Sequence, residues 1–141
     1  MRPMRPLNRP AREYGRGERG LATLETSLMI TVLVPLLFAV IEFGDLFQRW
    51  LAQESATVQA ARYAAELGGD APEVRALLGD ALAAAGIDRA RVVVEITPSR
   101  VGWRQPLTVS VRSDAVVAIP FALTTTIPLR TTAIVRGELN R

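Results

Sequence analysis

The 141-residue chain contains no cysteine and no histidine. Without cysteine, it can form neither a disulfide framework nor a thiolate metal site. Without histidine, it lacks the commonest general base and the commonest transition-metal ligand. An enzyme built from carboxylates alone survives these exclusions, but the acidic residues are scattered over expected helix ends and solvent faces. We therefore predict that the protein is not an enzyme and has no catalytic residues, no metal site, no cofactor and no small-molecule substrate.

Lysine is absent as well, so all 17 basic residues are arginines, and they are unevenly placed. Six of them fall in the first twenty residues against two glutamates, whereas the rest of the chain is close to neutral. A basic arm of this kind could bind nucleic acid. A long apolar segment follows the arm, however, and this order favours a lipid bilayer as partner and no nucleic acid.

Residues 21–41 read LATLETSLMITVLVPLLFAVI and hold a single charge, Glu25. A helix of this length spans roughly 30 Å, which is the thickness of the hydrocarbon core of a bilayer. The basic flank predicts a cytoplasmic N-terminus, so the rest of this single-pass chain is expected outside the cytoplasmic membrane. Pro35 lies inside the segment, lacks a backbone N–H, and is predicted to kink the helix.

Two ordinary interpretations of the apolar segment compete with a functional one. A cleaved secretory signal has a shorter apolar core and small residues before its cut, whereas this run ends in Glu42-Phe43-Gly44. A plain signal anchor fits the length and the flank but leaves Glu25 unexplained. A carboxylate inside a membrane span costs free energy, so its presence there points to a functional site.

The residues around Glu25 carry a family resemblance. A basic leader ending in Gly20, followed by Leu21-Ala-Thr-Leu-Glu25 and an apolar helix, resembles the processing site of type IV pilins and pseudopilins. The Glu-Phe-Gly at 42–44, the QAARYAA that follows and the terminal LRTTAIVRGE are similar to the TadE-like minor pseudopilins of the tight-adherence (Tad or Flp) pilus. Flp major pilins usually carry tyrosine after the glutamate, and Thr26 stands there in this chain, which favours a minor component.

The resemblance implies a mechanism for both ends of this motif. A prepilin peptidase is expected to cleave after Gly20 on the cytoplasmic side, leaving Leu21 with a free α-amino group and Glu25 as the fifth residue. Glu25 of one subunit is then expected to pair with the amine of another, which makes it an assembly residue. The implied partners are the peptidase, other pilins or pseudopilins, and the Tad assembly platform of a pilus or secretion assembly used in cell adhesion. The alternative is a single-pass, signal-anchored envelope protein whose exported domain binds a protein partner.

Sequence patterns predict an α+β fold of pilin-like form. The apolar helix, expected from about residue 22, should continue to Leu67 because residues 45–67 contain no proline or glycine and Gly68-Gly69 follow. A second, amphipathic helix is predicted with Asp70 as N-cap and with Gly86 at its end. Phe43, Phe47, Trp50, Val58, Ala61 and Ala65 are expected along one face of the long helix.

The remaining residues predict a roughly three-stranded antiparallel sheet. Its strands are expected at 91–97, at 107–119 with a break near Ser113-Asp114, and at 129–138. Trp103 lies in the first connection, where it either folds back onto the core or contacts a partner. The predicted domains are a basic cytoplasmic leader at 1–20, a transmembrane helix at 21–42, its extramembrane continuation at 43–69 and an exported α+β head at 70–141.

Overall fold

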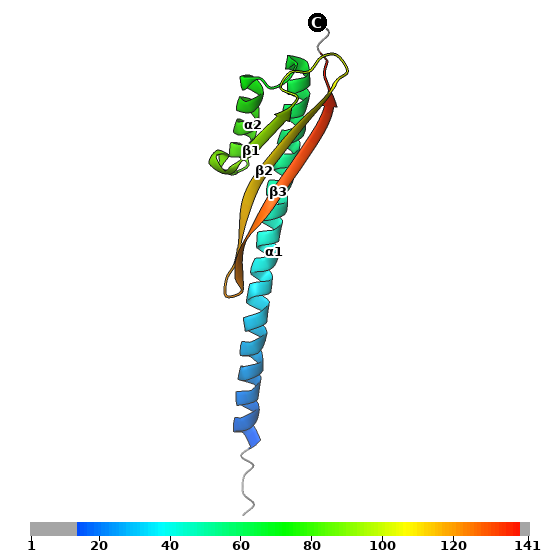
Figure 1. Cartoon of the computed structure of the whole chain (residues 1–141). Helices are drawn as coiled ribbons and strands as arrows, with labels where there is room; N and C mark the ends of the chain where they lie inside the picture. Colours follow the sequence, from blue (N-terminus) through cyan, green and yellow to red (C-terminus); the bar gives the residue numbers. More distant parts are fainter. Residues whose placement is uncertain (1–13, 139–141) are drawn as a thin grey trace, which may run out of the picture.

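A 54-residue helix forms the axis of the protein. The structure, a computed structural model, describes residues 14–138, so most of the predicted leader lies outside the described residues. Helix α1, Tyr14–Leu67, is about 80 Å long, and Figure 1 shows it as a shaft that carries a small head along its C-terminal part. The helix begins eight residues earlier than expected, because the glycines near its start weaken a helix without ending it.

The end of α1 follows the prediction. The N–H groups of Gly68 and Gly69 both donate to the Ala64 carbonyl, at 2.9 and 2.8 Å, and both glycines have positive φ. A Cβ at Gly69 would lie 2.2 Å from the Ser99 carbonyl oxygen. Only glycine therefore fits where the chain turns from α1 toward the head.

The second helix begins one residue later than its predicted cap implies. Helix α2, Pro72–Ala84, has Ala71 as its N-cap and no side-chain capping bond, so the prediction of Asp70 as N-cap is wrong. Asp70 instead accepts two hydrogen bonds from Arg75, at 2.8 and 2.7 Å, and this pairing raises the pKa of Arg75. Gly86, with φ of 72°, follows the helix end as predicted.

The sheet is a three-stranded antiparallel meander in the order β1-β2-β3, which confirms the predicted α+β architecture. Its strands are β1 (Val93–Thr97), β2 (Pro106–Ile119) and β3 (Leu123–Arg136), and a short 3₁₀ turn, η1 (Arg89–Arg91), precedes them. The predicted break near Ser113 is wrong, because β2 continues through it. β3 begins six residues earlier than expected and includes Pro128, which an edge strand tolerates because a proline there need not donate to the ladder.

The core lies between the upper part of α1, α2 and the sheet (Figure 1). On α1 it consists of small side chains, chiefly Ala56, Ala60, Ala61 and Ala64, which allow the sheet to approach the helix closely. The residues expected along one face of α1 do lie on one continuous helix, and the head covers only the upper part of that face. Ala61 and Ala65 are buried there, whereas Phe43 and Phe47 are exposed below the head. Trp50 is half-buried and lies 5.8 Å from Phe47 between ring centroids.

A buried polar network joins α1 to the two long strands. Gln53 Nε2 donates to the Val111 carbonyl at 3.0 Å and to Thr131 Oγ1 at 3.2 Å. Ser113 Oγ donates to Gln53 Oε1 at 2.5 Å. Thr57 Oγ1 lies 2.7 Å from the Gln53 carbonyl oxygen, to which it donates, and 2.7 Å from Thr131 Oγ1. Because these bonds are directional and their groups are buried, they fix the height at which the sheet sits on the helix.

Replacing Gln53 by alanine should destabilise the head by about 2–4 kcal/mol, because the change leaves Ser113, Thr131 and the Val111 carbonyl with unmet hydrogen bonds beside a new cavity. Thermal unfolding of the full chain in detergent, followed by near-ultraviolet circular dichroism, measures the loss. Gln59→Ala is the matched control, since Gln59 is exposed on the same helix and bonds only Ser55 Oγ. Equal melting temperatures for the two variants would show that the network does not stabilise the head.

Candidate functional site on the exposed shaft

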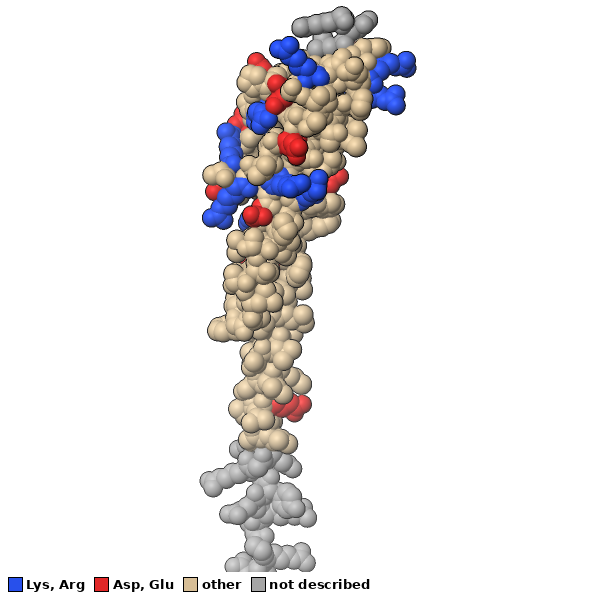
Figure 2. Space-filling model, viewed as in Figure 1, with Lys and Arg blue, Asp and Glu red and all other residues tan. Residues whose placement is uncertain are grey.

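The lower part of α1 is an apolar surface that the rest of the protein leaves uncovered. From Leu21 to Ile41 the large apolar side chains are exposed except Val34, which is half-buried, and none of the most apolar window of the helix is buried. Figure 2 shows the contrast: the coloured part of the shaft below the head is almost entirely free of charged side chains, whereas acidic and basic groups gather on the head. A core helix of a soluble domain would be mostly buried, so this helix has the length and surface of a membrane span.

Three hydroxyl side chains of this segment, those of Thr26, Ser27 and Thr31, bond to carbonyl groups of their own helix. Thr26 Oγ1 donates to the Ala22 carbonyl at 2.9 Å, and Thr31 Oγ1 donates to the Ser27 carbonyl at 2.8 Å. Ser27 makes the same bond to a carbonyl four residues before it. Side chains that bond back to their own helix expose no unmet donor, which suits a lipid environment.

Glu25 is the exception among these polar side chains. Its side chain is exposed, and it makes no hydrogen bond or ion pair with residues 20–138, the part of the chain whose side chains the structure describes. Leu21, the predicted new N-terminus, lies one helical turn earlier, so the two residues share a face of α1. Glu25 is therefore the one charged side chain of the apolar segment 21–41, and it has no partner among the described side chains. A carboxylate in such a segment indicates a candidate functional site.

The other predicted site residues lie on the same shaft. Gly20 is helical, and a side chain built there meets nothing within 4 Å. Pro35 lies inside α1, which continues through it in both directions, and the kink stays a prediction. The structure thus places Gly20, Leu21 and Glu25 within two turns of helix and Pro35 about three turns further along.

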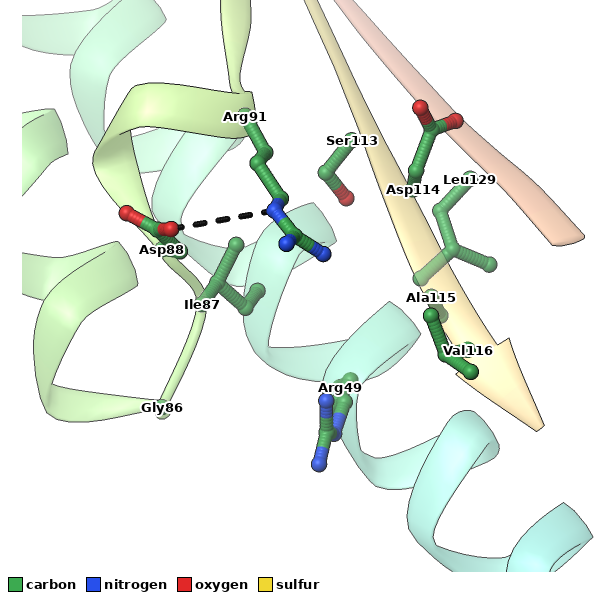
Figure 3. Close-up of a pocket in the computed structure, with 10 residues that line it drawn as sticks. All are labelled: Arg49, Gly86, Ile87, Asp88, Arg91, Ser113, Asp114, Ala115, Val116 and Leu129. Atoms are coloured by element: carbon green, nitrogen blue, oxygen red, sulfur yellow. Dashed lines mark ion pairs between the residues drawn. The ribbon is translucent and has the colours of Figure 1, made fainter. Parts of the chain in front are cut away.

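The head contains a shallow cavity of about 320 Å³ between α1, the segment before β1, and β2 (Figure 3). Its two arginines already have acidic neighbours: Arg91 Nε lies 3.8 Å from Asp88 Oδ2, and Arg49 Nε lies 2.8 Å from Asp45 Oδ2. Within the described part of the chain, no three acidic residues gather in a group that could hold a metal ion. Both arginines that line the cavity are thus already paired with an acidic residue close by in the sequence.

Sequence reasoning missed two features of the head. The hydrogen bonds of Gln53 to the two long strands were not predicted. The burial of Gln53 and Thr57 could have been, because both follow the same spacing of three and four residues as the buried alanines of α1. The exposed tip of the β2–β3 hairpin was also missed, because the residues from 120 to 128 were expected to form a connection. Trp103, for which a return to the core was one interpretation, is 54% exposed.

Comparison with known proteins supports the sequence resemblance. A family model described as TadE-like protein matches residues 20–62. The matched range begins at Gly20, covers the whole exposed apolar segment and extends along α1 beneath the head. No curated protein and no solved structure matches the chain. The match confirms the TadE-like resemblance for the helix that carries Glu25.

Proposed function

Because the TadE-like family assignment holds for residues 20–62, we propose that this chain is a minor pseudopilin, a membrane-inserted structural subunit of a Tad or Flp pilus or secretion assembly. The family is a structural, pilus-related one, and an N-terminal apolar helix fits a membrane protein of that kind. The observation that carries the finer proposal is the unpaired Glu25 on an uncovered apolar shaft. The subunit acts by assembly and not by catalysis.

In this proposal a prepilin peptidase cleaves after Gly20, and the new Leu21 amine becomes the partner that Glu25 lacks. The amine belongs to a neighbouring subunit, as the family resemblance implies. Opposite charges about 4 Å apart attract by roughly 4 kcal/mol at an effective dielectric constant of 20, although desolvation offsets part of this. The pair therefore serves mainly to set the register of an incoming helix.

The proposed topology follows from the arrangement of charge. The arginine-rich leader, residues 1–20, stays in the cytoplasm, residues 21–42 cross the cytoplasmic membrane, and the head from residue 70 lies outside. The segment 43–69 links the two, and it is helical as far as Leu67. Other pilins or pseudopilins and the Tad assembly platform are the proposed protein partners, with cell adhesion or secretion as the process that the assembly serves.

Mass spectrometry of the mature N-terminus tests this proposal against a signal-anchored envelope protein. After co-expression with a prepilin peptidase, the pseudopilin should begin at Leu21, because the peptidase cuts after Gly20. A signal anchor should instead keep residue 1 or 2 as its N-terminus. The same measurement without the peptidase is the control, and a Leu21 terminus there would attribute the cut to a different protease.

A further inference from the structure

The tip of the β2–β3 hairpin is an uncharged, exposed projection. No residue between Asp114 and Arg130 carries a charge. Phe121, in the turn between the strands, is 97% exposed, and Leu123 beside it is half exposed. A single exposed apolar side chain is ordinary, but a phenylalanine displayed at the end of a fifteen-residue uncharged hairpin is unusual for a surface in water.

The hairpin points along α1 toward the membrane-spanning segment (Figure 1). Ser113 of β2 is level with Gln53 of α1, because their side chains are hydrogen-bonded. Phe121 follows eight residues later, about 25 Å further along an extended strand. The same distance covers about 16 residues of helix, so the tip reaches approximately the level of Leu37. The apolar segment ends at Ile41, so the tip lies about 6 Å inside its outer boundary.

That depth identifies the chemistry of the partner. Amphipathic elements that lie on a membrane bury their apolar side chains about 5–10 Å into the boundary between headgroups and acyl chains. Part of the hairpin's backbone is unpaired. β1 pairs only with residues 108–112, and beyond them the outer edge of β2 has no strand beside it in the described chain. The hairpin can therefore lie in this boundary region but not deeper in the bilayer. Unpaired backbone groups are too costly in the hydrocarbon centre but are hydrated among headgroups.

We propose that the β2–β3 tip inserts into the outer leaflet of the bilayer, with Phe121 at the level of the upper acyl chains and Thr124, Thr125 and Thr126 among the headgroups. The threonines are exposed on the β3 side of the tip and supply hydroxyls at that level. The protein then contacts the membrane twice, through α1 and through the hairpin, which fixes the tilt of the shaft and the height of the head. This inference rests on the membrane insertion of the proposed function. On that function, the second contact must be released when the subunit enters a filament.

Spin labelling tests the proposal, and the absence of cysteine makes each label unique. Three full-length variants, Ala122→Cys, Leu28→Cys and Ile134→Cys, are labelled and reconstituted in phosphatidylethanolamine–phosphatidylglycerol vesicles. Ala122 keeps Phe121 in place, Leu28 reports the membrane span, and Ile134 is an exposed apolar residue of β3 in the head. The ratio of oxygen to nickel-complex accessibility at residue 122 should exceed that at residue 134 by roughly threefold or more, since oxygen concentrates in acyl chains.

Phe121→Asp in the Ala122→Cys background should lower this ratio to the value at residue 134, whereas Ile134→Asp in the same background should leave it unchanged. A ratio at residue 122 equal to that at residue 134 in the parent variant, with residue 28 in lipid, overturns the hairpin inference alone. An aqueous signal at residue 28 overturns the membrane insertion of the proposed function as well. If the high accessibility ratio at residue 122 disappears when the protein is diluted tenfold with lipid, a second copy of the chain, and not lipid, covers the tip, and the proposal is overturned.

Discussion

Replacing Glu25 by glutamine is expected to abolish pilus formation while leaving the protein at its normal level in the membrane. Glutamine keeps the shape and most of the hydrogen-bonding capacity of glutamate but removes the charge. In the proposed assembly, the Leu21 amine of a neighbouring subunit then lies unmatched in a medium of low dielectric, which costs several kcal/mol. A cost of about 3 kcal/mol corresponds to more than a hundredfold loss in incorporated subunits. Counting pili by electron microscopy, beside immunoblots for the subunit, measures both quantities.

The structure makes this variant a clean test, because Glu25 has no side-chain partner among residues 20–138, whose side chains the structure describes. Its replacement breaks no contact within the described chain and should ease membrane insertion slightly. Glu42→Gln is the matched control: Glu42 lies on the same helix just beyond the apolar segment, where water reaches it. It should leave pilus numbers close to wild type. Wild-type pili in the Glu25→Gln strain would make Glu25 a tolerated charge near the membrane surface and favour the signal-anchor interpretation.

The elements of the fold were predictable where local chemistry decides them. The length of the apolar run, the glycine pair after Leu67 and the alternating strand patterns each led to an element that the structure contains. The cap of α2 was not predictable in this way. The Asp70 carboxylate can accept hydrogen bonds either from the first backbone N–H groups of the helix or from the Arg75 side chain, and in the structure it accepts them from Arg75. A capping residue is read from sequence spacing, whereas an ion pair depends on how the chain enters the helix.

Long-range geometry was the part that the sequence could not supply. The start of β3 was predicted after Pro128, because proline is rare in central strands, but β3 lies at the edge of the sheet, where proline is tolerated. Because residues 123–128 belong to β3, the hairpin extends down the shaft and does not end within the head. Periodicity placed Phe43 and Phe47 on the same helix face as Ala61 and Ala65, but it does not give the height at which a sheet begins to cover that face, and both phenylalanines are exposed.

The candidate site could be proposed from the sequence alone because its residues are local. Gly20, Leu21 and Glu25 are close in sequence and lie on one continuous helix, so no tertiary contact is needed to bring them together. What the structure adds is the absence of competing contacts. Gly20 faces open space and Glu25 has no partner in the described chain. Variants at these two positions therefore report on outside partners and not on the stability of the head.

Replacing Gly20 by leucine is expected to leave an uncut precursor that still inserts into the membrane. A peptidase that cuts after glycine must accept the backbone without a large side chain at the cut, so a leucine there should reduce cleavage by about a hundredfold or more, equivalent to roughly 3 kcal/mol in the transition state. The change should not destabilise the folded chain, because a side chain at residue 20 meets nothing within 4 Å. Immunoblots after co-expression with the peptidase separate precursor from product by size, and mass spectrometry identifies each terminus.

Gly44→Leu is the matched control for this experiment. Gly44 is also a glycine inside α1 with open space around it, and both substitutions favour the helix by a similar amount, about 1 kcal/mol or less. The two variants therefore differ in their distance from the predicted cut and not in what they do to the fold. Normal cleavage of Gly44→Leu with failure of Gly20→Leu locates the cut after Gly20. Normal trimming of both would place the processing site elsewhere, and the proposed pairing of Glu25 with a Leu21 amine would then lose its basis.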